Sequence, residues 1–386
     1  MKGTINMKYI YCAGPTNVSD NVMLGRAKNF TNPDIDYSFF SQYKSICEKL
    51  QQIFKTKNDI VIMSGEGMIG LEASCACLTE KNDKVLVIGN GVFGKEFENL
   101  INLYDGNVTL FESPNDSPFL INDFKNFLKN NNDFKYATVV HCDTPSSMLN
   151  PINEICNELK KYNIITVVDM VASLGGSYVN VDESKIDIAI CASQKCFSAP
   201  PGVTFLSISK DAIDSMKNRK SKIPTYYMNF LNYLCYEEIK SFPYTMPISD
   251  LIGLEIAIDN ILEEGLINVL DRHKKISASL LKALKDNNLK SYLPDECSSE
   301  TVTTIIIDDP FKASDILDYI KNNYNIILSG SLGFLKDKVI RIGHMGENAK
   351  YEKIIPVLSA LEQAFSYFYK KDYNLVKDFN KYYTEY

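Results

Sequence analysis

One lysine of this 386-residue chain lies where a solvated surface cation would be badly placed. Lys195 comes just after the apolar run at residues 186–191 and just before a Pro-Pro-Gly turn at residues 200–202. Burial at the end of a strand lowers the pKa of a lysine amine and frees its nitrogen to act as a nucleophile. A Schiff base to an aldehyde cofactor requires such an amine. Because the chain has 41 lysines and arginines, this position indicates a site only together with other residues.

Two features upstream could serve the same cofactor. Asp169 ends the apolar run at residues 164–168, and the turn at residues 64–67 leads from a predicted strand into a predicted helix. The free N–H groups at the start of that helix, at Gly67 and Met68, can bind a phosphate. One phosphate loop, one distant lysine and one strand-end aspartate suggest a monophosphate cofactor that carries an aldehyde.

A second glycine-rich turn offers a competing interpretation. Residues 89–94 read Gly-Asn-Gly-Val-Phe-Gly between a predicted strand and a predicted helix, and Glu112 ends the next strand. This spacing matches the dinucleotide fingerprint, in which glycines approach the pyrophosphate and an acid holds the ribose. A lone match of this kind is weak, so an NAD-dependent oxidoreductase stays open as the remote alternative.

Strand-like and helix-like segments alternate up to about residue 250. The alternation predicts an open, mostly parallel α/β sheet, with functional residues at the carboxyl ends of its strands. The strands are expected at residues 60–63, 84–88, 108–111, 137–140, 164–168 and 186–191. The helices between them are expected at residues 68–78, 95–104, 121–131 and 152–162.

The pattern changes after about residue 250. Residues 251–289 read as one long helix that only Gly253 and Gly265 interrupt, and the domain join is expected there. The prediction is a large domain at residues 1–260, which includes an N-terminal arm, and a smaller α+β domain at residues 261–386. The strands of a second, smaller sheet are expected at residues 301–307, 326–329 and 338–342, with helices at 312–322 and 349–370 and an amphipathic helix in the tail.

Composition narrows the class of protein. With 45% hydrophobic residues the chain can bury a large core, and its net charge of −7 gives no reason to expect a nucleic-acid partner. The ten cysteines lack regular spacing and read as reduced thiols, and the three histidines form no metal-ligand motif. Residues 1–6 are not a signal peptide, and no later apolar run is long enough to span a membrane. The expectation is a cytoplasmic protein with neither metal nor membrane partner.

Five segments together resemble a class V, fold-type I, pyridoxal-phosphate aminotransferase of the alanine–glyoxylate/serine–pyruvate group. Each motif alone is modest, but they occur in the order of the family and span most of the chain. The block from Val168 to Gly176, read with Lys195, is the strongest part. The five segments are residues 14–16 (Gly-Pro-Thr), 64–73, 168–176, 193–195 (Ser-Gln-Lys) and 341–346.

The resemblance implies a role for the residues that face the cofactor. Lys195 would bind the aldehyde and move the proton of the substrate, and Asp169 would pair with the pyridinium nitrogen. The backbone at Gly67 and Met68, helped by the side chain of Gln194, would hold the phosphate.

Further positions match the family pattern at the edges of the site. Phe93 would stack on the pyridine ring, which gives the second glycine-rich turn a purpose. Val171, in the Asp169 block, would contact the cofactor, and Thr144 would lie near its phenolic oxygen. Arg341 would bind the substrate carboxylate through a planar fork. Thr245 would reach the phosphate of the neighbouring subunit, which implies a homodimer.

The chain departs from the family pattern at two residues. Met68 replaces a histidine of some relatives, and Glu66 brings a carboxylate close to the expected phosphate. Electrostatics disfavours that position unless the side chain of Glu66 points away. Both departures leave the choice of substrate open.

The predicted reaction moves the amino group of a small amino acid, alanine or serine, to glyoxylate or pyruvate. A 2-aminoethylphosphonate–pyruvate aminotransferase stays open as an alternative. A cysteine desulfurase is disfavoured, because Gln194 stands where a histidine would precede the lysine and no cysteine lies between Cys297 and Arg341.

Overall fold

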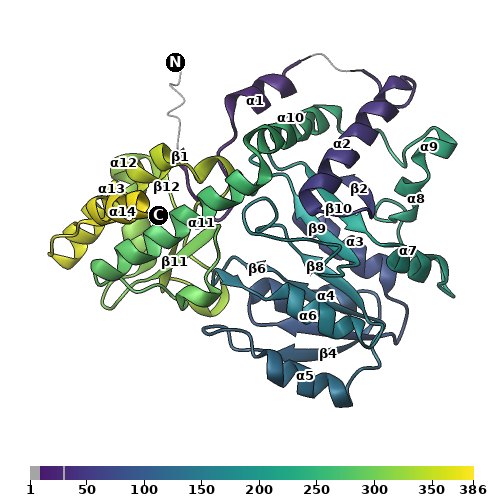
Figure 1. The fold of residues 1–386 in the computed structure, drawn as a ribbon, viewed down its shortest axis with the longest axis horizontal. Helices are drawn as coiled ribbons and strands as arrows, with labels where there is room; N and C mark the ends of the chain where they lie inside the picture. The colour runs from purple at the N-terminus through teal and green to yellow at the C-terminus, as the bar shows by residue number, and fades with distance from the viewer. Residues whose placement is uncertain (1–8, 29–30) are drawn as a thin grey trace.

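The computed structural model describes residues 9–28 and 31–386. Residues 1–8, which include the segment read as lacking a signal peptide and the start of the predicted arm, lie outside the described residues. Figure 1 shows a large body built around one sheet and a smaller body that contains the C-terminal helices. Among the described helices, none combines the length and the apolar character that crossing a bilayer would need.

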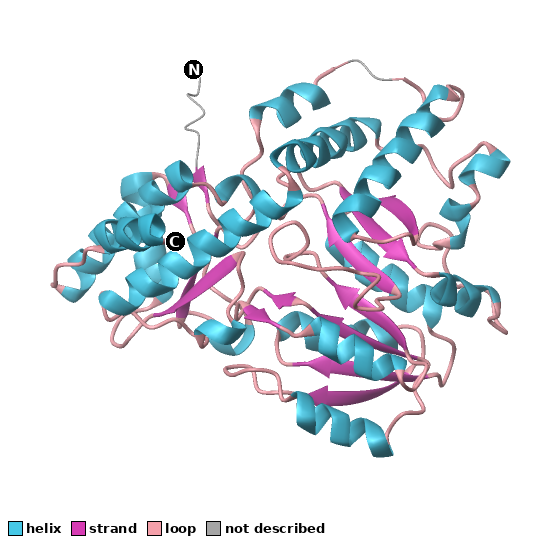
Figure 2. Ribbon diagram, in the orientation of Figure 1, coloured by secondary structure: helices cyan, strands magenta, loops and turns pink. Residues whose placement is uncertain are grey.

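Seven strands of the described chain form the central sheet, coloured magenta in Figure 2. They run in the order β2-β10-β9-β8-β5-β3-β4, and every neighbouring pair is parallel except the two that involve β10. The mostly parallel sheet is therefore confirmed. The seven strands are β2 (Asp59–Ser64), β3 (Lys84–Gly89), β4 (Asn107–Glu112), β5 (Tyr136–Val140), β8 (Ile165–Asp169), β9 (Ile188–Ala192) and β10 (Val203–Ile208).

Both faces of this sheet are covered by helices, because successive side chains of a strand point to opposite faces. In β2, Ile60 and Ile62 join the core under α2, α5, α6 and α10, whereas Val61 and Met63 join the core under α3, α4 and α7. The helices of the large body are α1 (Asp20–Arg26), α2 (Ser38–Phe54), α3 (Gly67–Leu78), α4 (Val92–Asn102), α5 (Ile121–Asn130), α6 (Ile152–Lys160), α7 (Lys210–Lys217), α8 (Leu231–Leu234), α9 (Tyr236–Ile239) and α10 (Ile248–Glu264).

The smaller body has its own hydrophobic core. Its long helix α11 contacts α14, the helix expected in the tail, which buries Leu375 and Phe379. The elements here are α11 (Leu266–Asp286), β11 (Val302–Ile306), α12 (Ala313–Tyr324), β12 (Ile326–Ile327), β13 (Val339–Gly343), α13 (Tyr351–Tyr369) and α14 (Leu375–Glu385). Short pieces complete the chain: β1 (Tyr9–Ile10), β6 (Cys142–Asp143), β7 (Met148–Leu149) and 3₁₀ turns at Asp295–Cys297, Gly333–Leu335 and Gly346–Asn348.

Two details of the predicted small domain are wrong. The strand β12 does not join the sheet of β11 and β13; it pairs in parallel with β1 of the N-terminal arm. The arm supplies its partners, since the Tyr11 N–H donates to the Ile327 carbonyl at 2.8 Å. The long helix breaks at Gly265, whose φ of +86° ends α10, but it does not break at Gly253. A side chain at Gly253 would press on Arg26 of α1, so this glycine serves close helix packing.

The same N-terminal arm runs tightly against β13. A methyl group at Gly343 would collide with the Cys12 carbonyl oxygen, and the Gly343 N–H donates to the Tyr11 carbonyl at 2.8 Å. We propose to divide the chain near the end of α10, into residues 1–260 and 261–386. The arm then ties the beginning of the chain to the small domain.

Gly343→Ala is expected to destabilise the protein by roughly 1–3 kcal/mol, because a backbone carbonyl cannot move aside without shifting the arm. Urea denaturation of the purified variant measures this loss. Gly330→Ala is the matched control, since its added methyl would make ordinary contacts with a Leu317 methyl at 3.5 Å and the Val339 carbonyl oxygen at 3.9 Å. Equal stability of the two variants would contradict the tight packing of the arm.

Candidate active site

One cavity lies at the carboxyl ends of the central strands, where the α/β topology predicts a site. It is bounded by the starts of α3 and α4, the ends of β8 and β9, and the loops that follow them. The structure brings eight of the predicted residues together around it: Gly67, Met68, Phe93, Thr144, Asp169, Val171, Gln194 and Lys195. The remaining lining residues are Glu66, Leu71, Cys142 and Ala172.

Lys195 lies three residues beyond the end of β9, and its side chain enters this cavity. Its amine donates a hydrogen bond to the Ala13 carbonyl of the N-terminal arm. Desolvation by burial, reinforced by the positive charge of Arg341, lowers the pKa of Lys195 below its ordinary value of 10.5. The amine is therefore more readily neutral, and more nucleophilic, than that of a surface lysine.

Asp169 is the last residue of β8, and it is 7% exposed. Its Oδ1 accepts the Val171 N–H at 2.8 Å, which fixes the direction of the carboxylate. Burial raises the pKa of Asp169 to about 7, although the Val171 hydrogen bond and Lys195 oppose the shift. A buried carboxylate held in this way can pair with a protonated ring nitrogen.

The start of α4 shows why the dinucleotide fingerprint at residues 89–94 misleads. Asp143, which is fully buried, accepts the N–H groups of Phe93 at 2.9 Å and Gly94 at 3.2 Å. Its carboxylate thus occupies the place where a pyrophosphate would bind, and Glu112 is ion-paired with Lys95 instead of facing a ribose. The NAD alternative is therefore not supported, and the turn serves to hold Phe93 at the cavity.

Arg341 lies on β13 of the small domain beside the same cavity. Its Nε donates to the Gly330 carbonyl at 2.6 Å and its Nη1 to the Thr144 carbonyl at 3.0 Å. The described residues supply no partner for Nη2, so this nitrogen is available to an anion. Arg341 is 9% exposed and close enough to Lys195 to influence its charge.

Glu66 does not point away from the cavity, contrary to the expectation for a phosphate site. It is the N-cap residue of α3, and its Oε1 accepts the Met68 N–H at 3.1 Å. Its Oε2 accepts the side-chain N–H of Gln194 at 3.3 Å. The carboxylate therefore uses a donor of the helix and the donor of Gln194, both of which were expected to hold a phosphate.

Thr245 lies outside this cavity. Its hydroxyl donates to the Asp34 carboxylate at 2.8 Å, and it occupies an exposed position in the segment between the short helix α9 and α10. The structure of one chain therefore does not bring Thr245 to its own Lys195. No role was predicted for Cys142 and Asp143, which directly precede Thr144; their position just after a predicted strand was the signal that could have found them.

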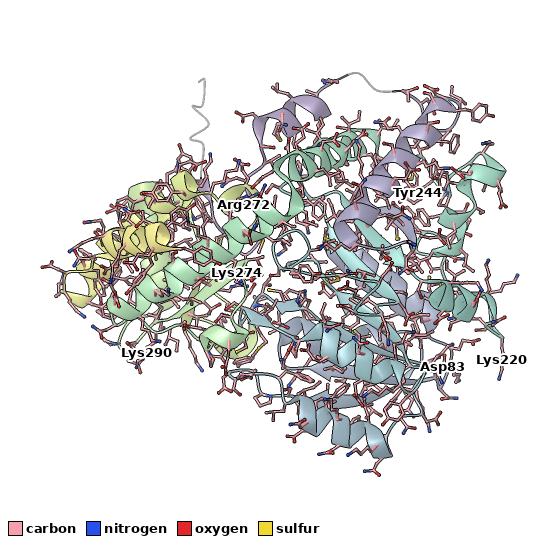
Figure 3. All side chains as sticks on the ribbon, in the orientation of Figure 1. Asp83, Lys220, Tyr244, Arg272, Lys274 and Lys290 are labelled. Atoms are coloured by element: carbon pink, nitrogen blue, oxygen red, sulfur yellow. The ribbon has the colours of Figure 1, made fainter. Side chains whose placement is uncertain are left out.

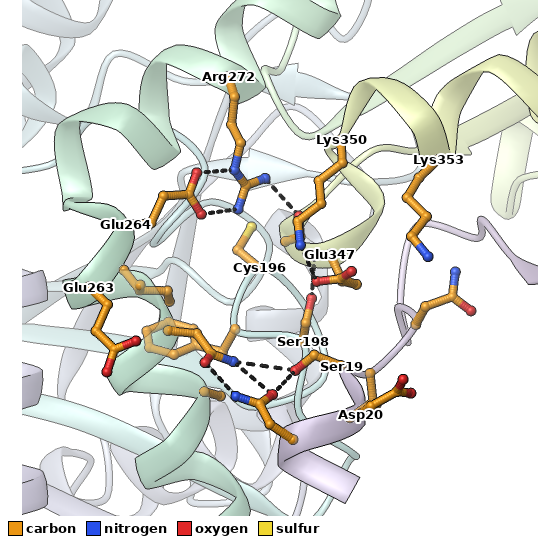
Figure 4. Close-up of a pocket in the computed structure, with 18 of the residues that line it drawn as sticks. Ser19, Asp20, Cys196, Ser198, Glu263, Glu264, Arg272, Glu347, Lys350 and Lys353 are labelled. Carbon is orange, nitrogen blue, oxygen red and sulfur yellow. Dashed lines mark hydrogen bonds and ion pairs between the residues drawn. The ribbon is translucent and has the colours of Figure 1, made fainter.

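A larger cavity of about 770 Å³ lies behind the Lys195 loop, where Cys196 and Ser198 line it. Figure 4 shows two ion pairs among its charged side chains: Arg272 with Glu264, and Lys350 with Glu347 at 2.8 Å. Arg272, also labelled in Figure 3, lies on α11 and further donates to the carbonyls of Gly346 and Ala349. These contacts join α10, α11 and the loop after β13, so this region braces the domain junction.

The fold and the site define a transaminase of the pyridoxal-phosphate type, and comparison with known proteins shows the family. Residues 15–333 match the family described as Aminotransferase class-V. The chain belongs to this family, and its fold is the predicted fold-type I architecture. Class-V aminotransferases use pyridoxal 5′-phosphate.

Individual relatives cover nearly the whole chain. An uncharacterized aminotransferase of Methanocaldococcus jannaschii is 33% identical over 92% of this chain and 92% of its own length. The pyridoxamine–pyruvate transaminase of Mesorhizobium japonicum is 29% identical over 92% and 90%. The alanine–glyoxylate aminotransferase of Rattus norvegicus is 28% identical over 92% and 86%.

Among solved structures, the ureidoglycine–glyoxylate aminotransferase of Bacillus subtilis superimposes with a TM-score of 0.94 at 26% identity, covering 100% of both chains. The predicted alanine–glyoxylate-like group is confirmed by these relatives.

The site fits the family cofactor better at its aldehyde and ring than at its phosphate. Lys195, Asp169 and Phe93 present an amine, a buried acid and an aromatic ring, which suit an aldehyde and a pyridinium ring. At the start of α3 the fit is poor, because the carboxylate of Glu66 already accepts the Met68 N–H.

Asp169→Asn is expected to change how stability depends on pH in protein stripped of cofactor. The pKa of Asp169 is 3.8 in the unfolded chain and rises to about 7 on folding, so the folded protein holds this proton more tightly. The free energy of unfolding therefore falls as the pH rises between these two values. The wild type should therefore lose roughly 1–4 kcal/mol relative to the variant between pH 4 and pH 8. Urea denaturation at each pH measures the difference in stability between wild type and variant, with Asp214→Asn at an exposed position as the control. A stability difference between wild type and Asp169→Asn that does not change with pH would contradict the raised pKa of Asp169.

Proposed function

We propose that the protein is an aminotransferase that moves the amino group of a small amino acid, alanine or serine, to glyoxylate or pyruvate. The donor carbon loses its amine and becomes a carbonyl, while the carbonyl carbon of the acceptor is reduced and gains the amine. The observation that carries this proposal is a single cavity in which the desolvated amine of Lys195 and the buried carboxylate of Asp169 meet.

Five residues in or beside the cavity have a task in that reaction. When bound, the cofactor withdraws electrons from the substrate carbon. Asp169 holds the proton of the ring nitrogen, and Phe93 and Val171 line the space for the ring. Lys195 accepts and returns the proton of the substrate carbon. Arg341 binds the carboxylate of the substrate through its remaining N–H groups.

A second candidate is the reaction named for the Mesorhizobium japonicum relative, transfer of the amine of pyridoxamine to pyruvate. The carboxylate of Glu66 at the start of α3 favours it, because pyridoxamine carries no phosphate for that carboxylate to repel. A 2-aminoethylphosphonate–pyruvate reaction is less well supported, since a phosphonate donor would add a further anion. A lyase such as a cysteine desulfurase is also poorly supported, because it needs a nucleophilic cysteine ahead of the carboxylate-binding arginine. This chain has no cysteine between Cys297 and Arg341. Assays of glyoxylate with alanine, and of pyruvate with serine, pyridoxamine and 2-aminoethylphosphonate, separate the candidates.

We also propose a cytoplasmic homodimer, in which Thr245 reaches the site of the partner subunit. The position of Thr245 supports this arrangement, because it is exposed and remote from Lys195 of its own chain. Sedimentation of the purified protein tests the dimer. The ten cysteines, none of them paired, suit a reducing compartment.

Lys195→Ala is expected to abolish the visible absorption that wild-type protein acquires with pyridoxal 5′-phosphate or pyridoxal, and to lower transamination by about 10²–10⁴-fold. Absorption spectra and a coupled assay measure both effects. Lys210→Ala, a surface lysine of α7, is the matched control. A wild-type protein that stays colourless with both compounds and binds NAD would contradict the proposal.

Arg341→Lys is expected to raise the KM for pyruvate or glyoxylate by about 10- to 100-fold, because an ammonium cannot hold two backbone carbonyls and a carboxylate together. Steady-state kinetics measures the change, with the cofactor spectrum as the control for an intact site. A KM within twofold of the wild-type value would show that another residue binds the carboxylate.

A further inference from the structure

The start of helix α3 is an acceptor-rich corner of the cavity. Two acceptors meet there: the carboxylate of Glu66, and the side-chain Oε1 of Gln194. Gln194 is 6% exposed, and within the described chain its Oε1 is buried without a hydrogen-bond partner. A buried acceptor without a donor is costly, so the ligand of this corner is expected to supply one.

Two of the donors of this corner are already in use. The Met68 N–H bonds the Glu66 Oε1 at 3.1 Å, and the Gln194 Nε2 bonds the Glu66 Oε2 at 3.3 Å. The orientation of the Gln194 amide follows from this contact, because the reversed amide would place its oxygen against the carboxylate. A ligand that needs these two donors must break both bonds, whereas a ligand that brings a hydrogen can keep them.

The charges at this corner also disfavour a phosphate. A phosphate monoester at neutral pH carries about −1.5 to −2 charges and offers almost only acceptors. Lys195 is the one lysine or arginine among the described residues that line the cavity, and it is needed at the aldehyde end. Among the described residues that line the cavity, no other lysine or arginine is therefore left to offset the repulsion between a phosphate and Glu66.

A hydroxymethyl group has the complementary chemistry. It is uncharged, its O–H can donate to Glu66 or to the Gln194 Oε1, and its oxygen can accept in turn. We infer that the start of α3 is a hydroxymethyl subsite, in which Glu66 and Gln194 make the protein bind pyridoxal and pyridoxamine in preference to their 5′-phosphates. This inference rests on the proposed function, since it assumes that Lys195 faces the aldehyde end of the same ligand.

A comparison within the molecule separates this role from ordinary helix capping. Asp143 caps α4 in the same way, but it is fully buried and does not line the cavity. Glu66 is exposed and lines the cavity, so its carboxylate faces whatever ligand binds there. Asp143 therefore positions Phe93, and Glu66 selects the ligand.

Binding to the full-length wild-type protein, stripped of any bound vitamer, tests the inference directly. Titrations with pyridoxal and with pyridoxal 5′-phosphate are followed by the visible absorption of the lysine-bound aldehyde and by the shift in Tm. Pyridoxal is expected to bind at least tenfold more tightly than its phosphate. Glu66→Gln is expected to tighten binding of the phosphate at least tenfold, while pyridoxal changes less than about threefold.

Control variants distinguish a failure of this inference from a failure of the proposed function. Glu72→Gln removes the same charge from α3 but lies outside the cavity, bonded to the Tyr104 hydroxyl at 3.1 Å, and should leave both affinities unchanged. Glu66→Ser, which retains an N-cap side chain, replaces Glu66→Gln should that variant fold poorly. Tighter binding of the phosphate to wild type, or a ratio unchanged in both Glu66 variants, would overturn the inference but not the transaminase. Binding of neither compound would overturn the proposed function and the inference with it.

Discussion

The site depends on removing two ionisable groups from water at the ends of neighbouring strands. Asp169 and Lys195 follow β8 and β9, which are parallel partners in the middle of the sheet, so helices on both faces bury them. Desolvation moves their pKa values toward each other, raising the acid and lowering the amine. An acid and a base poised in this way, rather than locked in a strong ion pair, can exchange protons with a ligand between them.

The remaining architecture holds other groups around that pair. Phe93 is placed by Asp143, which satisfies the start of α4 from within the chain, and Arg341 is brought by the small domain. The N-terminal arm closes the arrangement, because it pairs with β12, packs on Gly343 and offers the Ala13 carbonyl to Lys195. The lining residues come from the large body, and the small domain and the arm reach the same region through Arg341 and the Ala13 carbonyl.

Sequence reasoning found the parts of the site whose residue type and local setting carry the signal. A lysine, an aspartate and glycine-rich turns next to apolar runs predict strand ends, and the sheet and eight cavity residues followed. It missed β10, the pairing of β1 with β12, and the cap made by Asp143, because each depends on a partner distant in the chain. It left the direction of Glu66 open, since side-chain direction at a helix start is decided by donors such as Gln194.

The central claim is that Lys195 is a desolvated, nucleophilic amine, and the ionisation of that amine tests it most directly. In protein stripped of cofactor, the pH dependence of acetylation of Lys195 by acetic anhydride can be followed by mass spectrometry, with the exposed Lys210 as internal reference. The midpoint for Lys195 is expected to lie clearly below the ordinary lysine value of 10.5. A midpoint at or above 10.5 would contradict it.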